Sequence, residues 1–338
     1  VIGKMETMLA KYGKKIIGWD EILEGGLSPN ATVMSWRGEE GGIASALQSH
    51  DVIMTPGGNG MYLDHFQGDS KIEPVTIGGY TTLEKTYSYN PVPDTLVAMG
   101  KAHHILGVQV NTWSEYMYSN AIREYMMYPR TVALAEIAWT QNDKKDYKDF
   151  ERRINNAYVR LDGIGVNYHI PQPEQPNGSC NFVAFVDEVT IPFKTSRPID
   201  VVYTLDGSEP TPASTKYVEP LKFTESATLK IRSVLPSGKM SPTRTITVEK
   251  QALAPAKEVA EKKNGLQMKM AYGTYLNSAE LAKATDWKDL TIKTLRDIRS
   301  QEPTWENMRG VKYYSAIATG YVEIPEDGVY YFSSNNDE

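Results

Sequence analysis

Short apolar runs alternate with helical patterns over the first 140 residues. Four runs are apolar almost to their last residue, which is typical of strands buried on both faces of a sheet: residues 15–19, 32–36, 51–54 and 105–110. Helical patterns are found at residues 5–12, 42–49, 129–140 and 147–161. This alternation predicts a parallel sheet built from β-α units.

The pattern changes at residues 171–178, where three prolines within six residues disfavour both a helix and a central strand. We expect a domain linker there. From residue 182 to 248, short alternating strands are separated by turns at Asp206-Gly207 and Ser237-Gly238. They predict a small β-sandwich of about 80 residues.

A second linker, rich in Ala, Lys and Glu, is expected at residues 252–264, and residues 266–332 again have a β-rich pattern. The run Val329-Tyr330-Tyr331-Phe332 has the composition of a strand. The chain begins at Val1 without a methionine and stops soon after this run, so we expect it to be a fragment of a longer protein.

Composition and charge exclude several classes of function. The formal net charge is -6, with 42 acidic and 36 basic residues and no basic cluster, so nucleic acid is not an expected partner. The apolar runs are too short for a membrane span. Cys180 is the only cysteine, and the five histidines lack metal-site spacing, so we expect no disulfide, metal or other cofactor.

Aromatic and acidic residues gather where the four predicted strands end. Because a parallel β/α sheet places ligands outside the carboxyl ends of its strands, we expect these side chains to share one mouth. Indole faces can stack on the C–H surface of a sugar ring while carboxylates accept protons from its hydroxyls. The pattern therefore indicates sugar binding by Trp19, Trp36, Tyr62, Asp64, Trp113 and Glu115.

Structural roles compete with this interpretation. A tryptophan at a strand end is often part of the core, and Asp64 and Glu115 could pair with Arg37 or Arg123 instead. For the adjacent acids Asp20-Glu21 we expect helix capping or ion pairing of at least one residue. The glycine-rich residues 56–60 lack a phosphate-loop ending and are expected to turn the backbone into Tyr62.

Five ordered motifs within residues 18–139 resemble the β-N-acetylhexosaminidases of glycoside hydrolase family 20. They are Gly18-Trp19-Asp20-Glu21-Ile22-Leu23, Val33-Met34-Ser35-Trp36-Arg37-Gly38, Met61-Tyr62-Leu63-Asp64-His65, Asn111-Thr112-Trp113-Ser114-Glu115 with the strand before it, and Tyr128-Pro129-Arg130 through Leu134-Ala135-Glu136. The resemblance implies that residues 1–170 are the second half, strands five to eight, of a (β/α)8 TIM barrel.

Two further resemblances concern the β-rich regions. Residues 203–210, Tyr-Thr-Leu-Asp-Gly-Ser-Glu-Pro, look like the immunoglobulin-like domain that often follows the family's barrel, here expected at residues 171–251. Residues 320–325, 327–332 and 334–337 resemble the start of a PA14-type β-domain. A truncated PA14-like domain is therefore expected at residues 265–338.

The family's mechanism is substrate-assisted: the acetamide oxygen of the substrate attacks its own anomeric carbon. By resemblance, Trp19, Trp36 and Trp113 would wall the acetamide pocket, and Tyr62 would donate a hydrogen bond to the acetamide oxygen. The resemblance also implies that Asp64 and Glu115 accept hydrogen bonds from the distal sugar hydroxyls. The expected partners are oligosaccharides or glycoconjugates ending in N-acetylhexosamine, and the expected location is extracytoplasmic.

One departure from the family pattern is decisive. The family's His-x-Gly-Gly-Asp-Glu motif, which carries the orienting Asp and the general acid Glu, has no match in residues 1–338. We therefore expect this chain alone to be inactive, with the motif upstream of Val1. Two alternatives stay open at this point: an inert carbohydrate-binding protein that keeps the aromatic box, and an adhesion module built on the β-domains.

Overall fold

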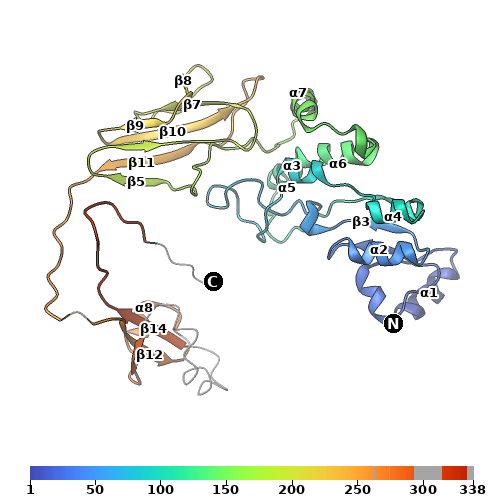
Figure 1. Ribbon diagram of the computed structural model, residues 1–338, viewed down its shortest axis with the longest axis horizontal. Helices are drawn as coiled ribbons and strands as arrows, with labels where there is room; N and C mark the ends of the chain where they lie inside the picture. Colours follow the sequence, from blue (N-terminus) through green and yellow to red (C-terminus); the bar gives the residue numbers. More distant parts are fainter. Residues whose placement is uncertain (262, 274, 293–313, 333–338) are drawn as a thin grey trace. The chain divides into compact units, whose positions relative to one another are not determined.

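The computed structural model describes residues 1–261, 263–273, 275–292 and 314–332 (Figure 1). The chain divides into two compact units, Val1–Gln251 and Ala252–Glu338, and each is described by itself.

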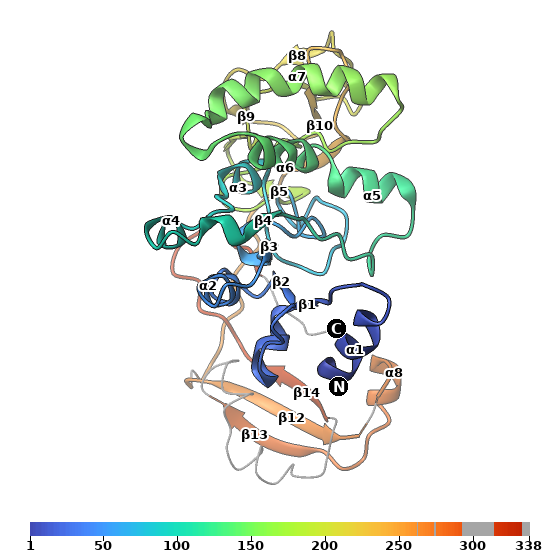
Figure 2. The ribbon, with the colours of Figure 1, turned by 90° about the vertical axis from the view of Figure 1, so that its right-hand side faces the viewer.

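A parallel four-stranded sheet forms the first part of unit 1, as the apolar runs predict. Its order follows the sequence: β1 (Ile17–Trp19), β2 (Thr32–Ser35), β3 (Val52–Met54) and β4 (Ile105–Val108). Helix α2 (Glu40–Leu47) lies beside β2 and β3, and α4 (Asp94–Ala98) lies next to α2 (Figure 2). Val52 and Met54 are fully buried in the core on this side.

The edge strands keep exposed apolar side chains. Ile17 on β1 is 56% exposed and Leu106 on β4 is 60% exposed. The sheet therefore presents apolar surface at both of its edges.

The other α-helices of unit 1 are α1 (Ile2–Ala10), α3 (Leu83–Ser88), α5 (Asn120–Met127), α6 (Arg130–Trp139) and α7 (Tyr147–Gly163). Of these, α6 contacts β4 and packs on α3. The hydroxyl of Ser119 and the carboxylate of Asp146 cap α5 and α7 by accepting backbone N–H bonds. The 3.6-residue spacing seen in α7 buries one stripe of this helix, made of Phe150, Ile154, Tyr158 and Leu161.

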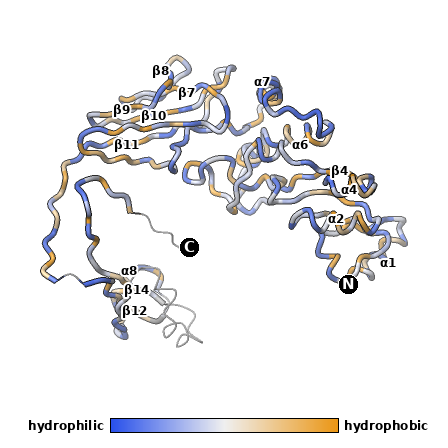
Figure 3. Tube along the Cα trace, in the orientation of Figure 1, coloured by the Kyte–Doolittle hydropathy of each residue, from blue (hydrophilic) through white to orange (hydrophobic). Residues whose placement is uncertain are grey.

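A β-sandwich completes unit 1. Its strands are β5 (Phe182–Phe185), β6 (Val189–Ile191), β7 (Asp200–Thr204), β8 (Thr215–Lys216), β9 (Leu221–Phe223), β10 (Ala227–Val234) and β11 (Arg244–Lys250). A five-stranded sheet of order β5-β11-β10-β7-β8 and the pair β6-β9 enclose one apolar core. Hydrophobic and hydrophilic positions alternate along strands such as β11 (Figure 3).

The proline-rich segment that connects the sheet to the sandwich is packed inside unit 1. Pro171 and Pro173 are buried, and Arg244 of β11 donates a hydrogen bond to the Pro173 carbonyl at 2.6 Å. Leu235, which follows β10, lies in the core formed by α3, α6 and α7. The two parts of unit 1 therefore share apolar packing across this segment.

Unit 2 contains an antiparallel sheet of order β13-β12-β14, formed by β12 (Leu266–Tyr272), β13 (Lys288–Ile292) and β14 (Tyr314–Thr319). A short helix, α8 (Ser278–Leu281), lies between β12 and β13 in the sequence. The strand predicted at residues 329–332 is wrong, since these residues form no strand. Strand composition alone is insufficient without a neighbour to pair with the backbone. Residues 334–337 of the PA14 resemblance lie outside the described residues.

Candidate active site

A pocket of about 450 Å³ opens where the chain leaves the four parallel strands. Trp19 is the last residue of β1, Trp36 directly follows β2, and the other lining residues lie in the segments after β3 and β4. The structure brings together all six side chains singled out from the sequence and adds three more. The full lining is Trp19, Glu21, Trp36, Tyr62, Asp64, His65, Ile77, Trp113 and Glu115.

Two aromatic pairs form walls of this pocket. The rings of Trp36 and Tyr62 are stacked with an interplanar angle of 7° and centroids 6.4 Å apart. Trp19 and Trp113 are tilted by 48°, with centroids 5.9 Å apart. Trp113 keeps 43% of its surface exposed, so one of its faces can receive a ligand. Such walls suit the apolar face of a sugar ring and a methyl group.

Backbone pairing beyond the strand ends fixes the position of Tyr62. Leu63 N donates to Asn111 O and Asn111 N donates to Met61 O, each at 2.8 Å, so the segments after β3 and β4 stay paired. Glycine at position 57 lets the Tyr62 ring pack closely, because a Cβ there would lie only 3.0 Å from the ring and would push it aside. Gly60 then turns the backbone with a φ of 95°, as expected for this glycine-rich segment.

Burial controls the chemistry of Tyr62. Desolvation is the main cause that raises the pKa of its phenol. The hydroxyl therefore remains protonated at neutral pH and available as a hydrogen-bond donor.

The two candidate acids differ in their surroundings. Asp64 is 5% exposed and its buried Oδ1 has no hydrogen-bond partner within the described part of the chain. Burial, more than any other cause, raises the pKa of Asp64. Glu115 is exposed. Neither acid is ion-paired with Arg37 or Arg123: Arg37 pairs with Asp20 and Glu24, and Arg123 donates to the side chain of Asn120.

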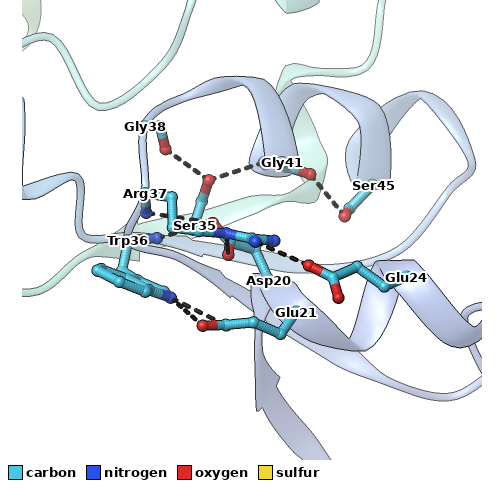
Figure 4. Close-up of polar contacts among 10 residues, drawn as sticks. Asp20, Glu21, Glu24, Ser35, Trp36, Arg37, Gly38, Gly41 and Ser45 are labelled. Carbon is cyan, nitrogen blue, oxygen red and sulfur yellow. Dashed lines mark hydrogen bonds and ion pairs between the residues drawn. The ribbon is translucent and has the colours of Figure 1, made fainter. Parts of the chain in front are cut away.

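Asp20 and Glu21 divide their roles at the end of β1 (Figure 4). The buried carboxylate of Asp20 accepts the Arg37 Nε–H at 2.6 Å and the backbone N–H groups of Trp36 and Arg37 at 3.2 Å. Ion pairing of one of the two acids is thus confirmed. Glu21 accepts the indole N–H of Trp36, with its two oxygens 3.0 and 2.9 Å from Nε1, and this bond is the main cause that lowers the Glu21 pKa. Glu21 therefore orients a wall of the pocket.

His65 and Ile77 are pocket residues that the sequence analysis missed. The His65 ring lies 5.6 Å from the Tyr62 ring, and its Nδ1 is 3.1 Å from the Thr81 hydroxyl oxygen. Burial is the main cause that lowers the His65 pKa, so the imidazole is neutral at neutral pH. Its place beside Tyr62 and Asp64 in the sequence was an available signal. Ile77 lies in a long segment without periodicity and offered none.

Within the described ranges, no three His, Cys, Asp or Glu side chains gather closely enough to hold a metal ion. In the same ranges no helix is long and apolar enough to cross a membrane.

Comparison with protein families shows which family the region of the sheet and its pocket resembles. Residues 1–142 match the model described as glycosyl hydrolase family 20, catalytic domain. These residues belong to glycosyl hydrolase family 20. Residues 184–245 match the chitobiase/beta-hexosaminidase C-terminal domain, which accounts for most of the β-sandwich.

Individual relatives agree with the family 20 assignment. A beta-hexosaminidase of Porphyromonas gingivalis is 52% identical over 337 residues, which cover 100% of this chain and 43% of that protein. A beta-hexosaminidase of Vibrio furnissii is 36% identical over 132 residues, covering 38% of this chain and 21% of that protein. The chain thus spans less than half of the length of these curated relatives.

Solved family 20 structures are also similar to part of the chain. The crystal structure of a GH20 exo beta-N-acetylglucosaminidase from Vibrio harveyi, in complex with N-acetylglucosamine, matches with 32% sequence identity and a TM-score of 0.45. The match covers 49% of this chain and 26% of that chain.

Proposed function

We propose that this chain supplies the acetamide-binding side of an exo-acting β-N-acetylhexosaminidase, which removes terminal β-linked GlcNAc or GalNAc. One observation carries the proposal: three indoles, one protonated phenol and three carboxylates, one of which orients an indole, line a single pocket of about 450 Å³. This volume accommodates one sugar residue with its acetamide group.

The proposed chemistry is substrate-assisted. The acetamide oxygen forms a bond to the anomeric carbon while the glycosidic bond breaks, and the leaving oxygen takes a proton from a general acid. Positive charge spreads over the resulting oxazolinium ring, which water then opens. In this scheme the indoles of Trp19, Trp36 and Trp113 enclose the acetamide, and Tyr62 donates its O–H to the acetamide oxygen and holds it in line for attack.

The two acids are proposed to bind the distal hydroxyls of the sugar. Asp64 is buried and lacks a partner for Oδ1, so an incoming hydroxyl would satisfy an unfulfilled acceptor. Glu115 lies at the exposed side of the same pocket. Together they would distinguish a hexosamine from sugars that lack matching hydroxyls.

We also propose that the four-stranded sheet is half of a (β/α)8 barrel, and that the chain alone lacks the general acid. The exposed Ile17 and Leu106 on the two edge strands support the first point. The absence of a His-x-Gly-Gly-Asp-Glu match from residues 1–338 supports the second.

The test compares this chain with the complete protein that contains it. We expect the complete protein to hydrolyse an aryl N-acetyl-β-glucosaminide but not the matching aryl β-glucoside, because only the former carries the acetamide nucleophile. The chain alone should hydrolyse neither, and hydrolysis by the chain alone would contradict the assignment of the acid. Sugar binding without hydrolysis by the complete protein would favour an inert carbohydrate-binding protein.

A further inference from the structure

Arg130 of α6 is fully buried behind the pocket and clamps the backbone around Asp64. Its Nη2 donates to the Leu63 carbonyl at 2.6 Å, and its Nη1 donates to the carbonyls of His65 at 3.1 Å and Thr81 at 2.8 Å. The carbonyls of Leu63 and His65 flank Asp64 on both sides. A single guanidinium thus fixes the peptide groups that carry this carboxylate.

Glu73 is a buried acid that interacts electrostatically with Arg130. The Glu73 side chain is 2% exposed, and its carboxylate accepts the Tyr125 hydroxyl at 2.8 Å and lies 3.1 Å from His169 Nε2. Burial acts to raise the pKa of Glu73, but the interactions with His169, Tyr125 and Arg130 lower it overall. Burial lowers the pKa of Arg130 to about 9, which leaves the guanidinium charged at neutral pH.

We propose that Arg130 and Glu73 are positioning residues that fix Asp64 and thereby set which hexosamine epimer the pocket accepts. The inference rests on the proposed function, because the position of Asp64 matters only if this carboxylate binds sugar hydroxyls. Neither Arg130 nor Glu73 lines the pocket. Arg130 acts through its hydrogen bonds to the Leu63 and His65 carbonyls, and Glu73 acts through its electrostatic interaction with Arg130. Small displacements of a binding group are sufficient to change catalysis by large factors.

The decisive experiment measures KM and kcat/KM of the Arg130→Lys variant of the complete protein. Lysine keeps the charge, but one ammonium cannot reproduce the fork that holds carbonyls on both sides of Asp64. We expect KM for the aryl N-acetylglucosaminide to rise several-fold, and the ratio of kcat/KM between the gluco and galacto substrates to change by about threefold or more. A loss of folded enzyme alone lowers apparent kcat equally for both substrates, so it leaves KM and the ratio unchanged.

Glu73→Gln provides a second variant if Arg130→Lys fails to fold, since it keeps the shape and a hydrogen-bonding side chain while removing the charge. The matched control is Arg244→Lys, because Arg244 is also buried and clamps the carbonyls of Pro173 and Cys180 without lining the pocket. We expect the control to change stability but neither KM nor the epimer ratio.

The outcomes separate the inference from the proposed function. Unchanged KM and epimer ratio in folded Arg130→Lys, or in Glu73→Gln if the lysine variant does not fold, would overturn the positioning role alone. An inactive wild-type complete protein would instead overturn the proposed function.

Discussion

At the scale of single residues, the pocket combines one hydrogen-bond donor that stays protonated, Tyr62, with two carboxylate acceptors that differ in burial. Asp64 is buried and Glu115 is exposed. Tyr62 keeps its proton because burial raises its pKa, and it lines the pocket together with three tryptophans and three acids. In the proposed reaction, the hydrogen bond from such a donor holds the acetamide oxygen in line with the anomeric carbon, and this alignment is needed to reach the transition state. The contribution of Tyr62 should therefore appear in the transition state more than in substrate binding.

Tyr62→Phe in the complete protein should lower kcat by roughly 100-fold, because the acetamide oxygen is no longer held in line. KM should change little, since the ring and its stacking on Trp36 remain. Steady-state kinetics on an aryl N-acetylglucosaminide measures both constants. Tyr118→Phe is the matched control, because Tyr118 is 87% exposed and lies outside the pocket lining. Equal kinetics for the two variants would remove Tyr62 from the proposed site.

Glu115→Gln should affect both kcat and KM. The substitution removes the negative charge at the exposed side of the pocket but keeps the side-chain shape, so hydrogen bonds to the sugar weaken in the ground state and in the transition state. Kinetics across a range of substrate concentrations resolves the two effects. A variant with wild-type values for both constants would show that Glu115 does not contact the sugar.

Residue types at strand ends were sufficient to predict six of the pocket residues, because parallel strands bring their carboxyl ends to one edge. The contacts that hold these pocket residues in place were harder to predict. Glu21 orients Trp36, and Arg130 holds Leu63 and His65, through contacts between residues distant in the sequence. Local patterns carry no information about such contacts.

At the scale of elements, apolar runs located the four strands well because burial on both faces demands nearly continuous hydrophobicity. The same reasoning failed at residues 329–332, where aromatic and β-branched residues form no strand. Strand formation depends on an available partner, which composition does not reveal. The sequence also did not predict the packing of the sandwich against α7. Arg197 of the sandwich donates a hydrogen bond to the Tyr158 hydroxyl of α7 at 2.6 Å.

Leu235→Ala should destabilise the sheet and the sandwich together, by roughly 2–5 kcal/mol, because Leu235 of the sandwich fills the core formed by α3, α6 and α7. Thermal unfolding followed by calorimetry gives the stability and the number of transitions in unit 1. Leu205→Ala is the control, since Leu205 is 46% exposed in the same domain. Two separate transitions with only one shifted would contradict shared packing.

At the scale of the whole molecule, the proposed half-barrel would leave two edge strands exposed in the isolated chain that a complete barrel would pair. A barrel has no sheet edges, whereas an open parallel sheet presents unpaired backbone groups and apolar side chains. If the sheet is half of a barrel, then the same side chain is exposed in one context and buried in the other. This difference can be measured with one substitution.

Ile17→Thr should reduce aggregation of the isolated chain, because it removes exposed apolar surface while keeping a β-branched side chain on β1. In the complete protein the same change should cost roughly 1–3 kcal/mol of stability, since the position would be buried. Light scattering and thermal unfolding measure the two effects. Val218→Thr, at a site 85% exposed in the sandwich, should be neutral in both contexts. If Ile17→Thr leaves the stability of the complete protein unchanged, position 17 is not buried there and the half-barrel is contradicted.

The buried prolines at 171 and 173 also determine where proteases can cut. A protease must draw several residues of extended chain into its active site, and this segment is held by Arg244 and by burial of Pro171 and Pro173. Residues 252–258 are exposed and include Lys257, a trypsin site. Brief digestion with trypsin should therefore cut after Lys257 and leave the sheet and the sandwich together on one fragment. Expression boundaries for the pocket belong after Gln251 rather than at the prolines.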